Sequence, residues 1–316
     1  MLVLLASGRA MTGPELALEL GVSRAAVWKQ IETWRNAGLD IDSGPRGYRL
    51  VRPLEPLDVG RIRPALPVHV RHRLGALENH WRLDSTSSEL ARRAAGLPDF
   101  SFVFADWQQA GRGRRGRQWL SPPAANLQFS CLKRFVGGYA GLSGLSLAAG
   151  VAAAQALEDC GVPDVALKWP NDLVHDDAKL GGILVELGGE FMGPCHAIIG
   201  IGINVHLSER VRATLNRPCT DLVRLRGDAP SRNGLATALV ARLVDALEVF
   251  DVSGFAVFAQ AWTERDALVG RTVRLEGAHG TFDGIAAGVD ARGALCVRTP
   301  EGTRVLDSAE VTVRPE

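Results

Sequence analysis

The chain has 316 residues, of which 46% are hydrophobic, so it can bury a sizeable core and is expected to fold into roughly two or three domains. Its 36 basic and 35 acidic residues give a formal net charge of +1, so any binding to nucleic acid must come from a local basic patch. The five cysteines show no CxxC spacing and are odd in number, which argues against a disulfide framework and against a cysteine zinc site.

The start of the chain gives no sign of export. The apolar run at residues 1–6 is too short for a signal peptide and has no basic segment, and no stretch reaches the length of a membrane span. The scattered cysteines fit a reducing compartment. We therefore expect a cytoplasmic protein with no membrane partner.

Residues 1–52 have the pattern of a winged helix-turn-helix domain. Thr12 is placed to cap one helix, and Ser23 is placed to cap the next. The stretch 39–50 alternates apolar and polar residues around a Gly-Pro turn, as a β-hairpin does. Apolar residues of the second helix fall at i, i+4 and i+7 and predict one buried stripe, made of Val27, Ile31 and Trp34.

Long cations of this domain are candidates for contacts with DNA phosphates. A winged helix that reads a palindrome does so as a two-fold dimer. The alternative is a small helical packing module that never touches DNA, because helix-turn-helix patterns recur in other folds. The residues predicted to contact DNA are Ser23, Arg24, Lys29 and Arg46.

The rest of the chain divides into three segments, which together predict an α+β protein. Four prolines mark residues 53–67 as a linker. Residues 68–268 alternate strand and helix patterns, as a mixed α/β domain does, and residues 269–316 predict a small SH3-like β-barrel. In the middle segment, strands are expected at 102–105, 127–132, 183–187 and 197–202, and helices at 144–157 and 235–250.

Residues 111–117 place four arginines among three glycines. Glycine lets the backbone approach a ligand closely, and guanidinium groups suit carboxylates and phosphates. Four like charges without an apolar face predict a mobile loop that an anionic ligand could order. Taken alone, the segment also fits non-specific binding of nucleic acid or an ordinary solvated loop.

Two further motifs combine cations with carboxylate or glycine. Lys168 and Asp172 belong to a Lys-Trp-Pro-Asn-Asp-Leu segment in which the proline makes a strand pass abruptly into a turn. Lys168 could face a phosphate, and Asp172 could bind Mg²⁺ beside a nucleotide, although Asn171 and Asp172 also fit an ordinary Asx turn. Lys179 precedes two glycines at a strand start, where a ligand can lie against the backbone.

Small and hydroxyl residues mark two more places. Gly200 and Gly202 lack the third glycine and the following helix of a dinucleotide fingerprint, so we reject a Rossmann site and favour small residues that line a ligand. Residues 84–89 have the hydroxyl density of a helix N-terminus. Such hydroxyls either cap the helix or hold a small polar ligand.

Three blocks, in this order and spacing, resemble the signature motifs of biotin protein ligases: residues 108–117, 168–173 and 179–186. The winged domain and the C-terminal barrel resemble the bifunctional members, which also repress the biotin operon. The likeness covers essentially the whole chain. It implies a catalytic domain of the biotin/lipoate ligase type, ATP with Mg²⁺ and biotin as substrates, and no tightly bound cofactor. Its implied partners are a biotin carboxyl carrier protein, operator DNA and a second copy of the chain when the adenylate is bound.

The resemblance also implies roles for particular residues. Asn171 and Asp172 match the pair that the family keeps near the phosphates, with Asp172 as the candidate Mg²⁺ ligand. The family often has Asn where this chain has Ser87, and the chain begins almost inside its first apolar run, so its first helix is expected to be short. The residues implied to bind biotin or its adenylate are Ser85, Thr86, Ser87, Gln108, Arg112, Gly113, Arg114, Lys179, Gly182 and Asn204. Those implied in catalysis are Arg112, Arg114, Lys168 and Lys179.

The chemistry of such a ligase explains these residue types. Attack of a carboxylate on the α-phosphorus of ATP brings two anions together, and cations offset that repulsion. A Gly-Arg loop that closes over the resulting anhydride excludes water. No cysteine or serine nucleophile is needed. Three alternatives stay open: a ligase with a non-regulatory N-terminal domain, a non-catalytic biotin-sensing transcription factor, and a lipoate-attaching enzyme.

Overall fold

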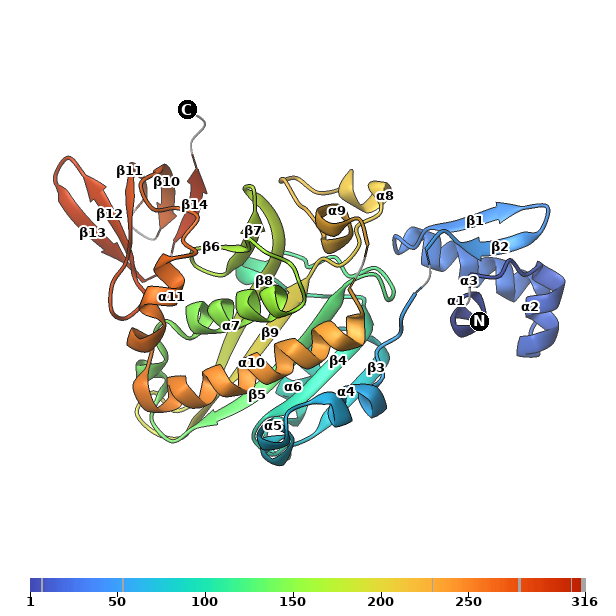
Figure 1. Cartoon of the computed structure of the whole chain (residues 1–316), viewed down its shortest axis with the longest axis horizontal. Coiled ribbons are helices and arrows are strands. Elements are labelled where there is room, and N and C mark those ends of the chain that lie inside the picture. The colour runs from blue at the N-terminus through green and yellow to red at the C-terminus, as the bar shows by residue number, and fades with distance from the viewer. Residues whose placement is uncertain (7, 53, 229, 278–279, 308, 314–316) are drawn as a thin grey trace.

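The computed structural model describes residues 1–316 apart from residues 7, 53, 229, 278–279, 308 and 314–316. Three parts follow one another along the molecule: a winged domain, a large sheet covered by helices, and a second sheet (Figure 1). The α+β class predicted from the sequence is confirmed. The domain ends assigned above stay predictions. Among the described residues, none of the helices combines the length and the apolar character that crossing a bilayer requires.

The N-terminal part is a winged helix-turn-helix. Thr12 forms a capping box: its hydroxyl accepts a bond from the Glu15 amide at 3.3 Å, and the Glu15 carboxylate accepts one from the Thr12 amide at 2.7 Å. Ser23 caps the next helix, whose predicted stripe is buried. The first helix has only five residues, as expected. The elements are α1 (Leu2–Ala6), α2 (Gly13–Leu20), α3 (Arg24–Asn36), β1 (Ile41–Gly44) and β2 (Gly47–Leu50).

The central part is built on a seven-stranded sheet in the order β3-β4-β5-β9-β8-β7-β6. The edge pair β3 and β4 is parallel, and the other neighbouring pairs are antiparallel. Gly182 lies opposite Gly202 in the ladder of β8 and β9, so glycines of two predicted motifs are neighbours. The strands are β3 (Leu77–Leu83), β4 (Ser101–Gln108), β5 (Leu127–Phe135), β6 (Ala166–Lys168), β7 (Asp172–His175), β8 (Ala178–Gly189) and β9 (Cys195–Ile203).

Helices cover both faces of this sheet. Side chains alternate across a strand, so Phe102 and Phe104 point to one side of β4 and Val103 points to the other. The phenylalanines belong to the main core with α7 and α10, whereas Val103 packs with Leu90 of α6. Alanines let α7 lie close to α10 (Figure 1). The helices are α6 (Thr86–Arg93), α7 (Leu145–Asp159), α8 (Glu209–Arg212), α9 (Leu222–Arg226), α10 (Arg232–Ser253) and α11 (Ala259–Thr263), with 3-10 turns η1 (Arg114–Gly116), η2 (Tyr139–Leu142) and η3 (Ala256–Phe258).

The predicted linker differs from the structure in its second half. Residues 59–65 form helix α4 (Val59–Ala65), which Asp58 caps, and α5 (Val68–Arg73) follows at once. Ile62 is fully buried in the main core, and α4 packs against α10. The four prolines predicted a linker, but Ile62 of α4 is buried in the main core, and burial of an apolar side chain favours the helix that positions it. Leu66, which follows α4, and Val70 of α5 are buried in the same core.

The C-terminal part is a five-stranded antiparallel sheet in the order β13-β12-β11-β10-β14. Its buried Val273, Leu295 and Val297 join the main core. The Trp169 indole donates a hydrogen bond to the Gly293 carbonyl at 3.0 Å, which ties this sheet to the turn before β7. The strands are β10 (Thr272–Gly277), β11 (Gly280–Val289), β12 (Leu295–Thr299), β13 (Gly302–Leu306) and β14 (Glu310–Val313).

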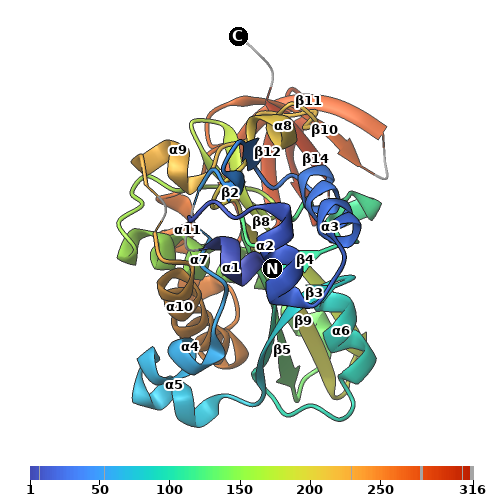
Figure 2. The ribbon, with the colours of Figure 1, turned by 90° about the vertical axis from the view of Figure 1, so that its right-hand side faces the viewer.

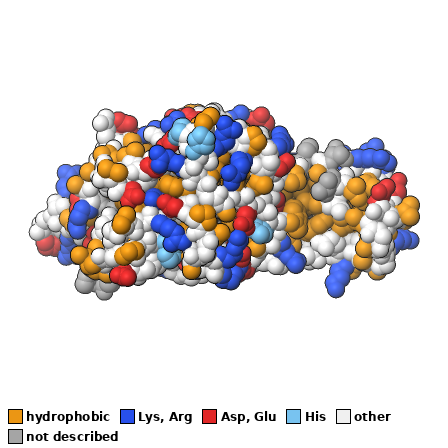
Figure 3. All heavy atoms as spheres, turned by 90° about the horizontal axis from the view of Figure 1, so that it is seen from below, with side chains coloured by type: hydrophobic (Ala, Val, Ile, Leu, Met, Phe, Trp, Pro, Cys, Tyr) orange, Lys and Arg blue, Asp and Glu red, His pale blue; other side chains and the backbone are white. Residues whose placement is uncertain are grey.

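The winged part rests against the β4 side of the central part (Figure 2). Trp107 of β4 packs into the apolar cluster of the winged part. At the same junction the Ser208 hydroxyl donates to the Gly38 carbonyl at 3.1 Å, and Arg210 donates to Asn36 at 3.2 Å. Figure 3 shows hydrophobic side chains gathered at this junction, while acidic and basic side chains are interspersed over the central body.

Candidate active site

A cavity lies on the α6 face of the central sheet, where the predicted motifs meet. Side chains alternate along β9, so Gly200 and Gly202 face the same side as Ile198, which packs under α6. Of the residues predicted to bind biotin, its adenylate or phosphate, the cavity wall contains Ser85, Thr86, Ser87, Gln108, Arg112, Gly113, Arg114, Asn171, Asp172, Lys179 and Gly182. Segments almost a hundred residues apart in sequence therefore share one site.

One end of the cavity is neutral and rich in hydrogen-bonding groups. Ser85 caps α6, which places the following hydroxyls at the end of the helix. The Thr86 amide and hydroxyl donate to Gln108 Oε1 at 2.8 and 3.1 Å. Ser130 Oγ lies 2.8 Å from Thr86 Oγ1 and 2.9 Å from Ser87 Oγ. This network fixes the hydroxyl positions and suits a neutral polar ligand head.

The other end of the cavity is charged. Lys179 is buried, with a side chain only 10% exposed, and its ammonium pairs with the Asp172 carboxylate. Arg217 Nη1 lies 3.7 Å from the second oxygen of the same carboxylate. Burial lowers the pKa of the Lys179 ammonium below its usual value, and the charge of Asp172 opposes that shift. This end suits an anion.

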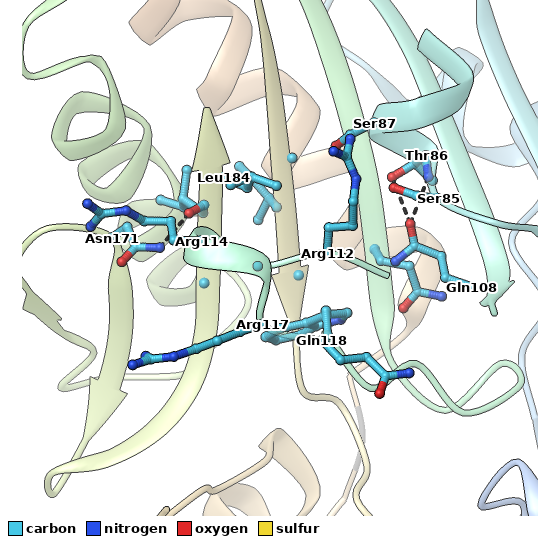
Figure 4. A pocket seen from close by; sticks show the side chains of 18 of the residues that line it. Ser85, Thr86, Ser87, Gln108, Arg112, Arg114, Arg117, Gln118, Asn171 and Leu184 are labelled. Atoms are coloured by element: carbon cyan, nitrogen blue, oxygen red, sulfur yellow. Dashed lines mark hydrogen bonds between the residues drawn. The ribbon is translucent and has the colours of Figure 1, made fainter. Parts of the chain in front are cut away.

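The Gly-Arg loop spans the space between these ends. The Gly113 amide donates to the Arg117 carbonyl at 2.7 Å and the Trp119 amide donates to the Gly111 carbonyl at 2.9 Å, so the loop is closed on itself. Arg112 pairs with Glu186 of β8 at 2.7 Å. In Figure 4 the hydroxyl cluster and Asn171 lie at opposite ends of the pocket; in this view the Arg112 side chain points towards Ser87, and the Arg114 side chain lies at the end where Asn171 is drawn.

Glycine is required where the loop and α6 approach the sheet. A Cβ at Gly202 would lie 2.5 Å from the Trp119 ring, and a Cβ at Gly200 would lie 2.9 Å from Ser87 Oγ. The two glycines therefore let a ring and a hydroxyl lie directly on the backbone of β9. This agrees with the interpretation of the segment as a lining strand and not as a dinucleotide fingerprint.

Two observations bear on what the cavity can hold. Trp119 Nε1 and Gln128 Oε1 line it and are buried with no hydrogen-bond partner in the part of the chain that the structure describes, so a ligand can supply partners. No cluster of three or more His, Cys, Asp or Glu residues with metal-binding geometry exists among the described residues. Asp172 alone fits a Mg²⁺ ion that takes most of its ligands from substrate phosphates and water.

Two predicted site residues do not reach the wall of the cavity. Lys168 ends β6 opposite Asp172 in the ladder with β7, and burial lowers the pKa of its ammonium. Asn204 is buried, and its amide donates to the carbonyls of Lys179 at 3.3 Å and Thr220 at 3.1 Å. Asn204 therefore supports the backbone of Lys179, and Lys168 lies on the strand beside Asp172. A direct contact of either residue with a ligand stays a prediction.

The cavity wall also contains Trp119 and Arg217, which no sequence motif had marked. Trp119 comes two residues after the Gly-Arg loop, and Gly202 directly under it was a usable signal. Arg217 belongs to an irregular segment with no motif. It reaches the cavity because Pro218 and Thr220 bond to the backbone of Lys179, a pairing that no local pattern in the sequence indicates.

A second hollow lies in the winged part, between α3 and the hairpin. Arg24 and Trp28 of α3 line it together with Ser43 and Tyr48. Lys29 and Arg46, the other cations predicted to contact DNA, are exposed but do not line this hollow. The Ser23 hydroxyl accepts a hydrogen bond from the Ala26 amide and therefore serves as a helix cap.

Comparisons with known proteins agree with this geometry. Residues 81–204 match the model of the biotin/lipoate A/B protein ligase family, residues 1–49 match an HTH domain, and residues 268–314 match the biotin protein ligase C-terminal domain. The bifunctional ligase/repressor BirA of Escherichia coli is 36% identical over 315 residues, 99% of this chain and 96% of that protein. The biotin--[acetyl-CoA-carboxylase] ligase of Paracoccus denitrificans is 35% identical and matches 73% of this chain and 97% of its own length.

A solved structure adds support for the fold. The biotin protein ligase from Aquifex aeolicus in complex with biotin and ATP has a TM-score of 0.64 and 28% identity, and the match covers 75% of this chain and 98% of that chain. The match to the BirA relative extends over nearly the full length of both proteins. The chain is therefore a ligase that belongs to the biotin protein ligase family.

Proposed function

We propose that this chain activates biotin with ATP to biotinyl-5′-AMP and transfers the biotinyl group to a lysine amine of a biotin carboxyl carrier protein. The observation that carries the proposal is one cavity lined by a hydroxyl and amide network, by the Gly-Arg loop, and by Lys179 with Asp172. The neutral end suits the ureido ring of biotin. The charged end suits the carboxylate of biotin and the phosphates of ATP.

The first step joins two anions. A carboxylate oxygen of biotin attacks the α-phosphorus of ATP, and the bond from that phosphorus to pyrophosphate breaks. Lys179 and the loop residues Arg112 and Arg114 offset the repulsion and the charge that grows on the phosphoryl oxygens. Asp172 and Asn171 lie where Mg²⁺ that enters with ATP would meet protein oxygens.

The second step releases the product to another protein. A lysine amine of the carrier attacks the carbonyl carbon of the adenylate, and AMP leaves, so no covalent bond to the ligase forms. The loop of residues 111–117 must cover the mixed anhydride against water and then open for the carrier. Cys131 and Cys195 are buried away from the cavity wall, which fits a reaction with no cysteine nucleophile.

The winged part supports a second activity, repression of a biotin operon by binding operator DNA. Exposed Arg24, Lys29 and Arg46 suit phosphate contacts, and α3 is placed to enter a groove. We propose that the chain dimerises when the adenylate is bound, because a palindromic operator needs two copies. A cytoplasmic location follows from both activities, since the carrier protein and the operator are found there.

One experiment tests the ligase proposal directly. The full chain is incubated with ATP, Mg²⁺ and either biotin or lipoate, and mass spectrometry detects the acyl adenylate and the modified carrier domain. We expect product with biotin and not with lipoate. Product with lipoate alone would establish the lipoate-attaching alternative, and binding of biotin without any adenylate would establish the non-catalytic sensor.

The regulatory proposal needs its own measurement. Sedimentation of the chain at micromolar concentration, with and without biotin and ATP, should show a monomer that becomes a dimer. Identical masses in the two conditions would remove the adenylate-driven switch and favour a ligase whose N-terminal domain does not regulate.

A further inference from the structure

We propose that Arg217 is a further catalytic residue, whose guanidinium binds the pyrophosphate portion of ATP while Lys179 binds nearer the reacting carboxylate. The inference rests on the proposed adenylation. It deepens that proposal by assigning the leaving group to a residue from the irregular segment between α8 and α9, which no sequence motif marks.

The first observation is the shared carboxylate. Lys179 pairs with one oxygen of Asp172, and Arg217 Nη1 lies 3.7 Å from the other oxygen. Both cations also line the cavity. A single carboxylate therefore holds two cations in the wall of the cavity, at its charged end.

The second observation is that the backbone under Arg217 is fixed. The Lys179 amide donates to the Pro218 carbonyl at 3.0 Å, and the Thr220 amide donates to the Lys179 carbonyl at 2.9 Å. Arg212 adds a bond to the Cys219 carbonyl at 2.7 Å. The segment is thus joined to the start of β8, and the position of Arg217 relative to Lys179 is part of the fold and not an accident of a loose loop.

The third observation separates the roles of the two cations. The Lys179 side chain is 10% exposed, whereas the Arg217 side chain is 42% exposed. Lys179 therefore lies inside the cavity and Arg217 lies at its mouth. The reacting carboxylate and α-phosphorus lie inside, so the outer phosphates meet Arg217.

When ATP binds, Lys179 and Arg217 exchange the Asp172 carboxylate for the phosphates as their anionic partners. A Mg²⁺ ion that arrives with ATP would compete with Lys179 and Arg217 for the oxygens of Asp172. The phosphates that enter with the ion offer new oxygens, and the guanidinium presents paired donors in a fixed planar fork that matches two of these oxygens, whereas an ammonium has no such fixed geometry. Asp172 thereby holds the two cations in place until the substrate takes them over.

The test compares Arg217→Ala and Arg217→Lys with the control Arg224→Ala, which removes an exposed arginine of the neighbouring α9 outside the cavity wall. ATP–pyrophosphate exchange gives KM for ATP, pyrophosphate and biotin, and calorimetry gives the binding of pyrophosphate to the protein. For Arg217→Ala we expect kcat/KM for ATP to fall roughly 10- to 100-fold, with KM for biotin unchanged. Arg217→Lys should recover part of this loss, because it keeps the charge without the planar fork.

Unchanged KM values for ATP and pyrophosphate in a folded Arg217→Ala variant would overturn the inference. An equal fall in kcat/KM for ATP in Arg224→Ala would also overturn the inference, because the fall would then follow from the loss of any positive charge near the site. A rise in KM for biotin alone would also contradict it. Thermal melting confirms that each variant is folded. If the unmodified chain makes no biotinyl adenylate, the proposed function fails, and that result is distinct from failure of the role of Arg217.

Discussion

The central part contains two buried ion pairs between a cation and an aspartate. One is enclosed by protein hydrogen bonds, and the other faces the cavity. Arg232 at the start of α10 is 4% exposed and pairs with Asp106 of β4, which is 2% exposed, at 2.8 Å. The remaining donors of Arg232 bond to carbonyls of Asn126 and Glu55, and Asp106 also accepts from the Leu57 amide. Each of the three guanidinium nitrogens of Arg232 therefore donates to at least one oxygen of the protein.

The pair of Lys179 and Asp172 is different because it faces a cavity. The ammonium has one carboxylate partner and lies 5.9 Å from the centre of the Trp119 ring, and Asp172 divides its oxygens between two cations. Burial lowers the pKa of the Lys179 ammonium, because removal from water disfavours its charged form. The comparison teaches that completeness of partners, more than burial, separates an ion pair that holds the fold from one that serves a ligand.

The largest effect on stability is expected when the ion pair of Arg232 and Asp106 is broken. Arg232→Ala leaves Asp106 as a buried charge without its cation, and loss of one partner of such a pair costs about 3–5 kcal/mol in the free energy of unfolding. Urea denaturation measures this cost. Arg242→Ala is a matched control on the same helix, where the exposed pair with Asp159 should contribute no more than about 1 kcal/mol. Equal losses in the two variants would contradict the distinction.

Breaking the pair of Lys179 and Asp172 should instead lower activity strongly and stability only slightly. Lys179→Gln removes a cation from the transition state, so adenylate formation should slow about 10²- to 10³-fold. Stability should change little, because Arg217 still faces Asp172 and a desolvated ammonium has been removed. Stopped-flow adenylation and urea denaturation are measured on the same protein. A drop in unfolding free energy as large as that of Arg232→Ala would show that Lys179 is structural.

A third substitution tests the loop that covers the site. Arg114→Ala should release biotinyl adenylate about 10- to 100-fold faster, because one charge-assisted contact to the bound intermediate is lost. The off-rate is measured by fluorescence or filter binding. Arg115→Ala, in the same loop but outside the cavity wall, is the control. An off-rate for Arg114→Ala equal to that of the unmodified chain would remove the loop from retention of the intermediate.

Much of the fold was predictable because local signals and burial agree. The caps at Thr12 and Ser23, the stripe in α3 and the strands of the central sheet all follow patterns that the structure keeps. The linker shows where such signals conflict. The four prolines predicted a linker there, yet residues 59–65 form helix α4, whose Ile62 is buried in the main core.

The candidate site was predictable only where motifs mark it. The Gly-Arg loop, Asp172 and Lys179 could be placed together by resemblance, and the cavity does contain them. Arg217 could not be found, because it reaches Asp172 through backbone pairing of residues about forty positions apart in sequence. Lys168 of the same motif as Asp172 lies at the end of β6, outside the cavity wall, so its role in catalysis stays a prediction.

The smallest effect is expected at an exposed pair that holds α6 beside the site. Arg93 of α6 donates to Glu78 of β3 at 2.7 Å and lowers the pKa of that carboxyl from 4.5 to about 2. A lowered pKa stabilises the folded chain above pH 4.5, and this contribution is lost as the pH falls from 4.5 towards 2. Glu78→Gln should therefore be less stable than the unmodified chain at pH 6 by less than about 1 kcal/mol, because water screens the pair.

The pH dependence identifies the cause of that difference. Urea denaturation at pH 6, 4 and 3 should show the deficit of Glu78→Gln shrinking, because the Glu78 carboxyl group of the unfolded chain binds a proton below pH 4.5 while that of the folded chain stays ionised until about pH 2. Glu19→Gln, an exposed carboxylate on α2, is the control and should change stability little at any of these values. A deficit for Glu78→Gln that stays constant from pH 6 to 3 would mean that packing of the side chain, and not its charge, ties β3 to α6.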